Sequence, residues 1–125
     1  IVNITSAMVK SPSPTMGLST AVRAGLTALS KSVQHSTVEF NVTINNLLPE
    51  RFDTPRQEFM ARQLMATEGI DRASARQRIA DSLPARRFGR PEEFGAACAF
   101  LCGASSGFMT GQNLLLDGGS YWGLV

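Results

Sequence analysis

Apolar side chains recur every three or four residues between Gly17 and His35, and this spacing predicts an amphipathic helix. Its apolar positions are Leu18, Val22, Leu26, Leu29 and Val33. Small residues lie between them, so this helix is expected to pack closely against a sheet or another helix. The segment before it, residues 10–14, contains two prolines and two serines and is expected to be a loop.

Two shorter helices are expected in the second half of the chain. Asp71 is a suitable N-cap for a helix that continues to about Asp81. Pro91 suits a first helical turn, so a further helix is expected from there to about Cys102. The polar stretch 50–70 is expected to be irregular to helical.

Three other runs predict strands, over residues 1–6, 38–48 and 111–119. The first is rich in β-branched residues and is expected to be buried on both faces, as strands of parallel sheets are. Strands that alternate with helices favour right-handed crossovers and a parallel sheet. The predicted fold class is therefore α/β.

Composition narrows the possible partners. The net charge of +2, from 12 basic and 10 acidic residues, gives no reason to expect nucleic acid or a membrane surface as a partner. No apolar run approaches the roughly 20 residues that cross a bilayer. Cys98 and Cys102 are four residues apart, a spacing that suits neither a disulfide nor a zinc site, so we expect reduced thiols, no metal and a cytoplasmic location.

The first residues, Ile1-Val2-Asn3, resemble the middle of a buried strand. We therefore expect residues 1–125 to be the C-terminal portion of a longer protein. The alternative is that this run is an edge strand of a complete domain.

Candidate chemistry lies near the start of the chain. Ser6 follows the first strand, and Ser19 and Arg23 are four residues apart on the next helix. Residues at this spacing share one helical face, so both side chains are expected to point into one site.

Several motifs together resemble the C-terminal half of a short-chain dehydrogenase/reductase. Ser6 precedes Ser19 by thirteen positions, the interval that separates the family's catalytic serine and tyrosine. The run 41–49 is similar to the family's next strand, and the runs 88–93 and 110–119 are similar to its closing segments. The resemblance implies part of a Rossmann-like, doubly wound parallel sheet with flanking helices.

The resemblance also exposes a departure, because Ser19 and Arg23 occupy the positions of the family's tyrosine acid/base and lysine. An alternative register places Met16 and Thr20 there and restores neither residue. The implied catalytic residues are Ser6, Ser19 and Arg23. A serine hydroxyl is a much weaker acid than tyrosine, so Ser19 is not expected to replace it by pKa tuning alone.

The resemblance implies a nicotinamide cofactor, NAD or NADP, contacted here by Arg23, Pro49, Phe52 and Thr54. Glu50 stands where the family usually has glycine, and it is expected to crowd the cofactor, to face solvent or to add an acid/base group. The family's phosphate-binding glycine loop would lie before Ile1.

Two functions follow from this resemblance. The first is NAD(P)-dependent hydride transfer on a small carbonyl or alcohol substrate, 3-oxoacyl compounds included. The second is a catalytically degenerate family member that acts as a cofactor-binding or assembly module. In either case the family implies a homodimer or homotetramer, and residues 50–84 are expected to cover the substrate.

Overall fold

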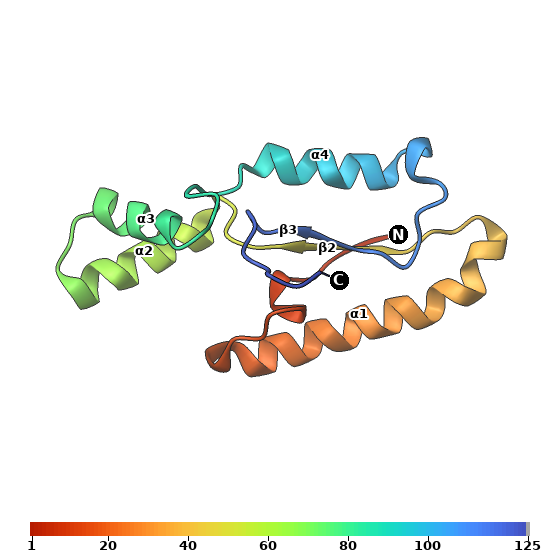
Figure 1. The fold of residues 1–125 in the computed structure, drawn as a ribbon, viewed down its shortest axis with the longest axis horizontal. Coiled ribbons are helices and arrows are strands. Elements are labelled where there is room, and N and C mark those ends of the chain that lie inside the picture. Colours follow the sequence, from red (N-terminus) through yellow and green to blue (C-terminus); the bar gives the residue numbers. More distant parts are fainter. Residues whose placement is uncertain (125) are drawn as a thin grey trace.

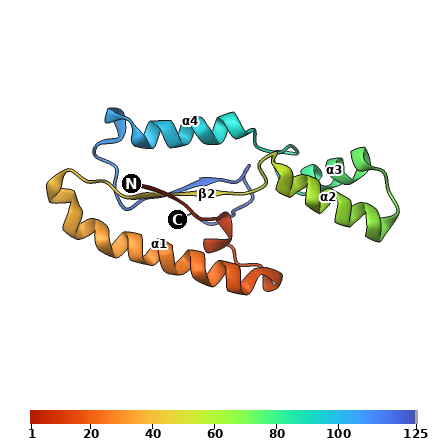
Figure 2. The ribbon, with the colours of Figure 1, turned by 180° about the vertical axis from the view of Figure 1, so that it is seen from behind.

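The computed structural model describes residues 1–124, which form three layers beside a projecting helical hairpin. The central layer is a parallel sheet in the order β1-β2-β3, made of β1 (Val2–Ile4), β2 (Asn45–Pro49) and β3 (Asn113–Leu116). Helix α1 (Gly17–Thr37) covers one face and α4 (Pro91–Cys102) covers the other (Figures 1 and 2). This arrangement confirms the α/β class and the parallel sheet.

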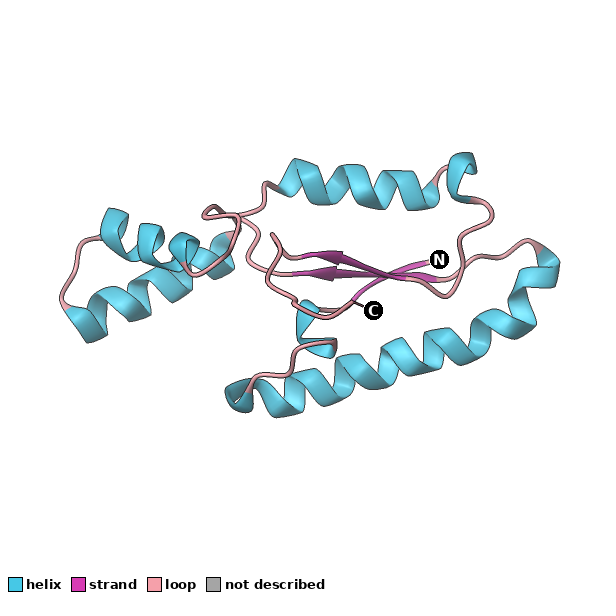
Figure 3. Ribbon diagram, in the orientation of Figure 1, coloured by secondary structure: helices cyan, strands magenta, loops and turns pink. Residues whose placement is uncertain are grey.

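The hairpin consists of α2 (Pro55–Glu68) and α3 (Arg72–Asp81) and extends beyond the carboxyl ends of the strands (Figure 3). It has a small core of its own, in which Ala61, Ala75 and Ile79 are buried. Short 3₁₀ turns complete the chain: η1 (Ala7–Val9), η2 (Pro14–Met16), η3 (Val38–Phe40) and η4 (Ala104–Ser106).

Helix ends follow local signals. Asp71 caps α3 through a 2.8 Å hydrogen bond from the backbone N–H of Ser74, as its position predicts. Helix α4 begins at Pro91 and ends at Cys102, which confirms the predicted bounds.

The strands depart from prediction at two places. Among residues 1–124, β1 is an edge strand in which the Ile4 side chain is 59% exposed, so these residues do not give the burial on both faces that was expected. The predicted strand 38–48 begins only at Asn45, because η3 prolongs the turn after α1 and Asn41 adopts a left-handed conformation with φ of 59°.

A ladder of asparagine side chains crosses the sheet on adjacent strands. Asn3, Asn46 and Asn113 are in register, and the Nδ2 atom of Asn46 donates to Oδ1 of Asn113 at 2.8 Å. Asn3 Nδ2 donates to Oδ1 of Asn46 at 3.2 Å and to the Ser30 hydroxyl of α1 at 2.9 Å. The central residue, Asn46, is only 1% exposed, so its amide is satisfied by these side chains.

This ladder explains the orientation of α1. The buried side chains of the helix are polar: Thr20, Thr27, Ser30 and Gln34. Its apolar stripe points away from the sheet, and Leu18 at its start is 83% exposed. The predicted amphipathic helix is confirmed, and its polar face is the one that packs on the sheet.

The start of α4 provides a pH-dependent contact. Two hydrogen bonds from the Arg87 guanidinium, each 2.8 Å, and one from the backbone N–H of Arg90 lower the pKa of Glu93 from 4.5 to about 2. A carboxyl whose pKa is depressed by folding stabilises the fold above its unfolded-state pKa and loses this contribution as pH falls.

We therefore expect the urea midpoint to fall more between pH 4.5 and 2 in the parent protein than in Glu93→Gln. The exposed neighbour Glu92 offers a matched control, and Glu92→Gln should retain the parent's pH dependence. Parallel pH profiles for the parent and Glu93→Gln would contradict the assignment.

Candidate active site

The candidate site lies at the carboxyl ends of the strands, where ligands bind in open α/β sheets. Ser6 ends the segment after β1 and is the N-cap of η1, with its hydroxyl oxygen 3.2 Å from the donating N–H of Met8. Because the oxygen acts here as an acceptor, the Ser6 proton stays available for donation to a ligand. The η1 turn packs against α1, which brings Ser6 to the helix that carries the other two candidates (Figure 1).

Ser19 and Arg23 meet on one face of α1, as their spacing predicts. Nη1 of Arg23 donates to the backbone carbonyl of Ser19 at 3.2 Å and also to the Ser19 hydroxyl. Both side chains are half-buried. The guanidinium therefore fixes the Ser19 oxygen as an acceptor and leaves the Ser19 proton free to donate.

Nε and Nη2 of Arg23 have no protein partner within residues 1–124, so they can receive ribose hydroxyls. Two neighbours of the candidate serines are also polar and buried. The hydroxyls of Thr5 and Thr20 are inaccessible and lack a hydrogen-bond partner in the described chain.

Next to these residues, β2 ends in the loop that starts at Pro49. The backbone N–H of Glu50 donates to the carbonyl of Leu116 at 3.0 Å, and its carboxylate lies 3.5 Å from Nε of Arg51. In this loop Arg51 adopts a left-handed conformation, with φ of 50°. Arg51 comes one position after Glu50, which stands where the family usually has glycine. Glu50 is therefore held by the sheet and by its neighbour.

Phe52 and Thr54 have different surroundings. The Phe52 ring packs edge-on against Phe94 of α4, with ring centroids 5.4 Å apart, and it also contacts Gly89 closely. These contacts anchor the loop to the body. Thr54 is exposed at the start of α2, and its hydroxyl makes no capping hydrogen bond, so it is available to a ligand.

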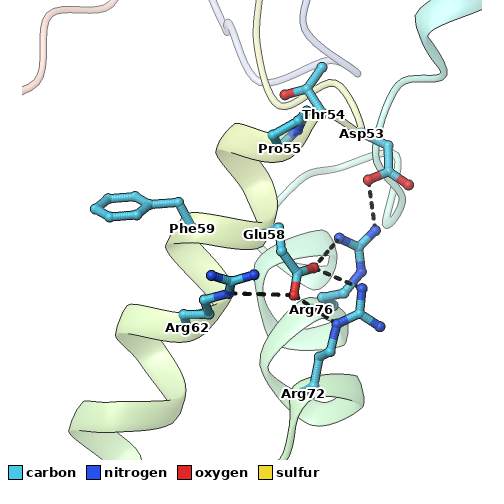
Figure 4. Close-up of a pocket in the computed structure, with 8 residues that line it drawn as sticks. All are labelled: Asp53, Thr54, Pro55, Glu58, Phe59, Arg62, Arg72 and Arg76. Carbon is cyan, nitrogen blue, oxygen red and sulfur yellow. Dashed lines mark hydrogen bonds and ion pairs between the residues drawn. The ribbon is translucent and has the colours of Figure 1, made fainter.

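An ion cluster at the base of the hairpin was not expected from the sequence. Glu58 accepts two hydrogen bonds of 2.8 Å from Arg72, and Arg76 reaches it at 3.5 Å (Figure 4). Arg76 also pairs with Asp53 at 2.8 Å. The hydrogen bonds and charge of Arg72 lower the pKa of Glu58, and Glu58 raises the pKa of Arg72.

The cluster lines a hollow of about 640 Å³ that also includes Thr54 and Phe59. The sequence held one signal for it: Glu58 and Arg62, and likewise Arg72 and Arg76, are spaced by four residues. That spacing favours a solvated helical face as well, so the sequence alone did not show that the two helices share one carboxylate.

Comparison with known proteins assigns the family. The family model described as enoyl-(acyl carrier protein) reductase matches residues 1–121. The chain belongs to the short-chain dehydrogenase/reductase family. This chain is 32% identical over 120 residues to the NADPH-dependent reductase BacG of Bacillus subtilis. The aligned region covers 96% of this chain and 46% of BacG.

Solved structures of the family have the same fold. The NADPH-dependent reductase YwfH, involved in bacilysin biosynthesis, superposes with a TM-score of 0.90 at 30% identity, over 99% of this chain and 47% of that one. L-sorbose reductase from Gluconobacter frateurii, complexed with NADPH and L-sorbose, gives 0.89 at 26% identity, over 99% and 48%. This chain thus spans about half the length of its relatives.

From residue 1 to 124, histidine, cysteine and carboxylate side chains form no group of three that could hold a metal ion. Within the same range, none of the helices is both long and apolar enough to cross a membrane.

Proposed function

We propose that the chain is the substrate-facing portion of an NAD(P)-dependent oxidoreductase acting on a small carbonyl or alcohol substrate. One observation carries the proposal: Arg23 fixes the Ser19 hydroxyl on α1, and the η1 turn that Ser6 caps packs against this same helix. Such an arrangement would offer two hydroxyl donors to one substrate oxygen at the carboxyl edge of a parallel sheet, one of them bonded to a positive charge. Relatives named as NADPH-dependent reductases support the same reaction class.

The residues present fit the nicotinamide end of such a cofactor. Thr54 offers an exposed hydroxyl without a capping bond, and two nitrogens of Arg23 have no partner in the described part of the chain. Pro49 and Phe52 belong to the loop that leads from the end of β2 to Thr54. The described chain contains no glycine-rich turn between a strand and a helix, so the cofactor's phosphates would be bound by residues outside it.

When bound, the cofactor would supply or accept the hydride. Ser6 and Ser19 would donate hydrogen bonds to the substrate oxygen, which polarises a carbonyl and favours the negative charge that forms on it. The Arg23 charge, acting through the Ser19 hydroxyl, would stabilise that oxygen further. Because neither serine is acidic enough to give up its proton, the alkoxide would take its final proton from water.

The second candidate is a catalytically degenerate member that binds cofactor or assembles without turnover. Its support is specific: Arg23 is bonded to Ser19 within its own helix, and no tyrosine stands on that face. In both candidates, the segment 50–84 would cover the substrate. This segment contains the α2–α3 hairpin and the hollow described above.

Two measurements on the protein that contains this chain test the proposal. Reduced nicotinamide cofactor should bind, detected by its fluorescence, and oxidation of that cofactor should accelerate with members of a carbonyl panel, detected by absorbance. Binding without turnover on any carbonyl would favour the degenerate candidate. Failure of both NADH and NADPH to bind would contradict the oxidoreductase and the cofactor-binding form of the second candidate, and would leave only the assembly module.

We further propose a cytoplasmic homodimer or homotetramer that buries the outward stripe of α1. Leu18, Val22 and Leu29 on this stripe are all exposed, a larger apolar surface than a solvated helix usually presents. Light scattering should give a dimer or tetramer mass at micromolar concentration, and Leu29→Arg should shift the mass toward the monomer. Ala28→Arg, at the exposed neighbouring position off this stripe, is the control.

A further inference from the structure

The hollow in the α2–α3 hairpin carries more positive than negative charge. Three guanidinium groups, those of Arg62, Arg72 and Arg76, line it with only two carboxylates, Asp53 and Glu58. The local balance is thus one positive charge. Oxyanions are the ligands that arginine recognises best, because its planar donors match carboxylate and phosphate oxygens.

Arg62 is the least satisfied of the three arginines. Its side chain is 74% exposed, and its only ion-pair contact among residues 1–124 is a 4.0 Å approach of Nε to Glu58. Its Nη1 and Nη2 atoms therefore lack protein acceptors. Arg72 uses Nε and Nη2 on Glu58, and its Nη1 has no partner among the residues that the structure describes.

The surroundings of this charge suit an organic anion. Phe59 lines the same hollow with an exposed ring, and Figure 4 shows it projecting from α2 one turn before Arg62. Thr54, the candidate contact for the nicotinamide, is one of the residues that line the hollow. An anion in the hollow would thus stand close to the site of the proposed hydride transfer.

We propose that this hollow binds an oxyanion, a carboxylate or phosphate group of the substrate, through Arg62 and Arg72. The inference rests on the proposed function for the rest of the substrate, but anion binding itself needs no turnover. Phe59 contacts the carbon part of the ligand. Glu58 competes with the oxyanion for the same arginines and keeps them oriented when no ligand is bound.

A purely structural role predicts different behaviour. Glu58 could serve only to join α2 to α3, and its removal would then loosen the hairpin without changing anion affinity. The two roles therefore differ in the sign of the effect at Glu58. Under the proposal, Glu58→Gln frees arginine donors and tightens anion binding, whereas Arg62→Gln weakens it.

The test is an NMR titration of the arginine Nε–H signals in the full protein, with inorganic phosphate and with oxalate at constant ionic strength. Arg62→Gln should weaken binding about tenfold or more, as loss of a hydrogen bond to a charged group implies. Arg78→Gln removes the same charge from the same hairpin outside this hollow, so it should bind like the parent.

Each outcome bears on the proposal. Preference for phosphate or for oxalate supports it and identifies the anion class. No saturable shift with either anion, equal weakening in Arg62→Gln and Arg78→Gln, or unchanged affinity in folded Glu58→Gln would overturn it. Should Glu58→Gln lose helical circular dichroism, the Arg62 and Arg78 pair still decides.

A second arm separates this inference from the proposed function. A 2-oxo acid and its methyl ester are compared as substrates, and the acid should have the lower KM in the parent but not in Arg62→Gln. Reduction of neither compound would count against hydride transfer, while the titration would still test the hollow. Equal KM values for acid and ester in the parent would show that the anion of the substrate does not occupy it.

Discussion

Replacing Ser19 with tyrosine and Arg23 with lysine together is expected to raise kcat for carbonyl reduction by about 10²–10⁴-fold, the usual contribution of a positioned general acid. A tyrosine has an ordinary pKa near 10, and a neighbouring ammonium lowers it toward the working pH. The two positions already meet on one face of α1, because Arg23 hydrogen-bonds Ser19. Steady-state kinetics of the protein that contains this chain would measure the change.

Two single changes separate acid catalysis from bulk. Ser19→Phe adds a ring without a hydroxyl and should give no gain in kcat. Ser19→Tyr with Arg23 retained should gain less than the pair, since a guanidinium bonded within the helix is a poorer partner for the phenol. A folded, cofactor-binding double variant that turns over no faster than its parent would contradict the assigned site.

The asparagine ladder is expected to show the largest effect on stability. Asn46→Asp places a carboxylate at a position that is 1% exposed and removes the N–H that Asn113 accepts. A buried carboxylate without a charged partner should lower the free energy of unfolding by about 3–5 kcal/mol at pH 7. Urea denaturation of the variant and the parent would measure this loss.

The sign of its pH dependence follows from burial. Burial raises the pKa of the introduced carboxyl, so the neutral form is tolerated. The penalty therefore grows as pH rises from the carboxyl's unfolded-state pKa to its raised folded-state pKa, and it is complete above that. Asn41→Asp makes the same chemical change at an exposed residue and should cost little at any pH. Equal losses in the two variants would contradict the role assigned to the ladder.

Local signals in the sequence predicted helices better than strands. The proline at the first turn of α4 and the Asp71 cap of α3 act through near neighbours, so both starts could be predicted. The start of β2 could not be predicted from such local signals. Asn45 and Asn46 have low strand propensity, and they extend the chain there because distant groups, among them the Met109 carbonyl and Asn113, satisfy their amides.

In the candidate site, too, contacts within one helix could be predicted, whereas contacts between separate helices could not. A spacing of four residues on one helix was enough to place Ser19 beside Arg23. The cluster around Glu58 joins residues 14 and 18 positions apart on two helices, so it depends on how α2 and α3 fold back on each other. No periodicity within a single helix encodes that arrangement.

The ladder that joins β1, β2 and β3 also restricts how these strands can align. Amide pairs bond only when a donor faces an acceptor, whereas leucines tolerate many neighbours. Sliding any one strand by a single residue would replace that strand's amide in the row with a side chain from the opposite face. Non-native strand registers thus lose several directional hydrogen bonds at once. The row of amides therefore selects the native register while the sheet assembles.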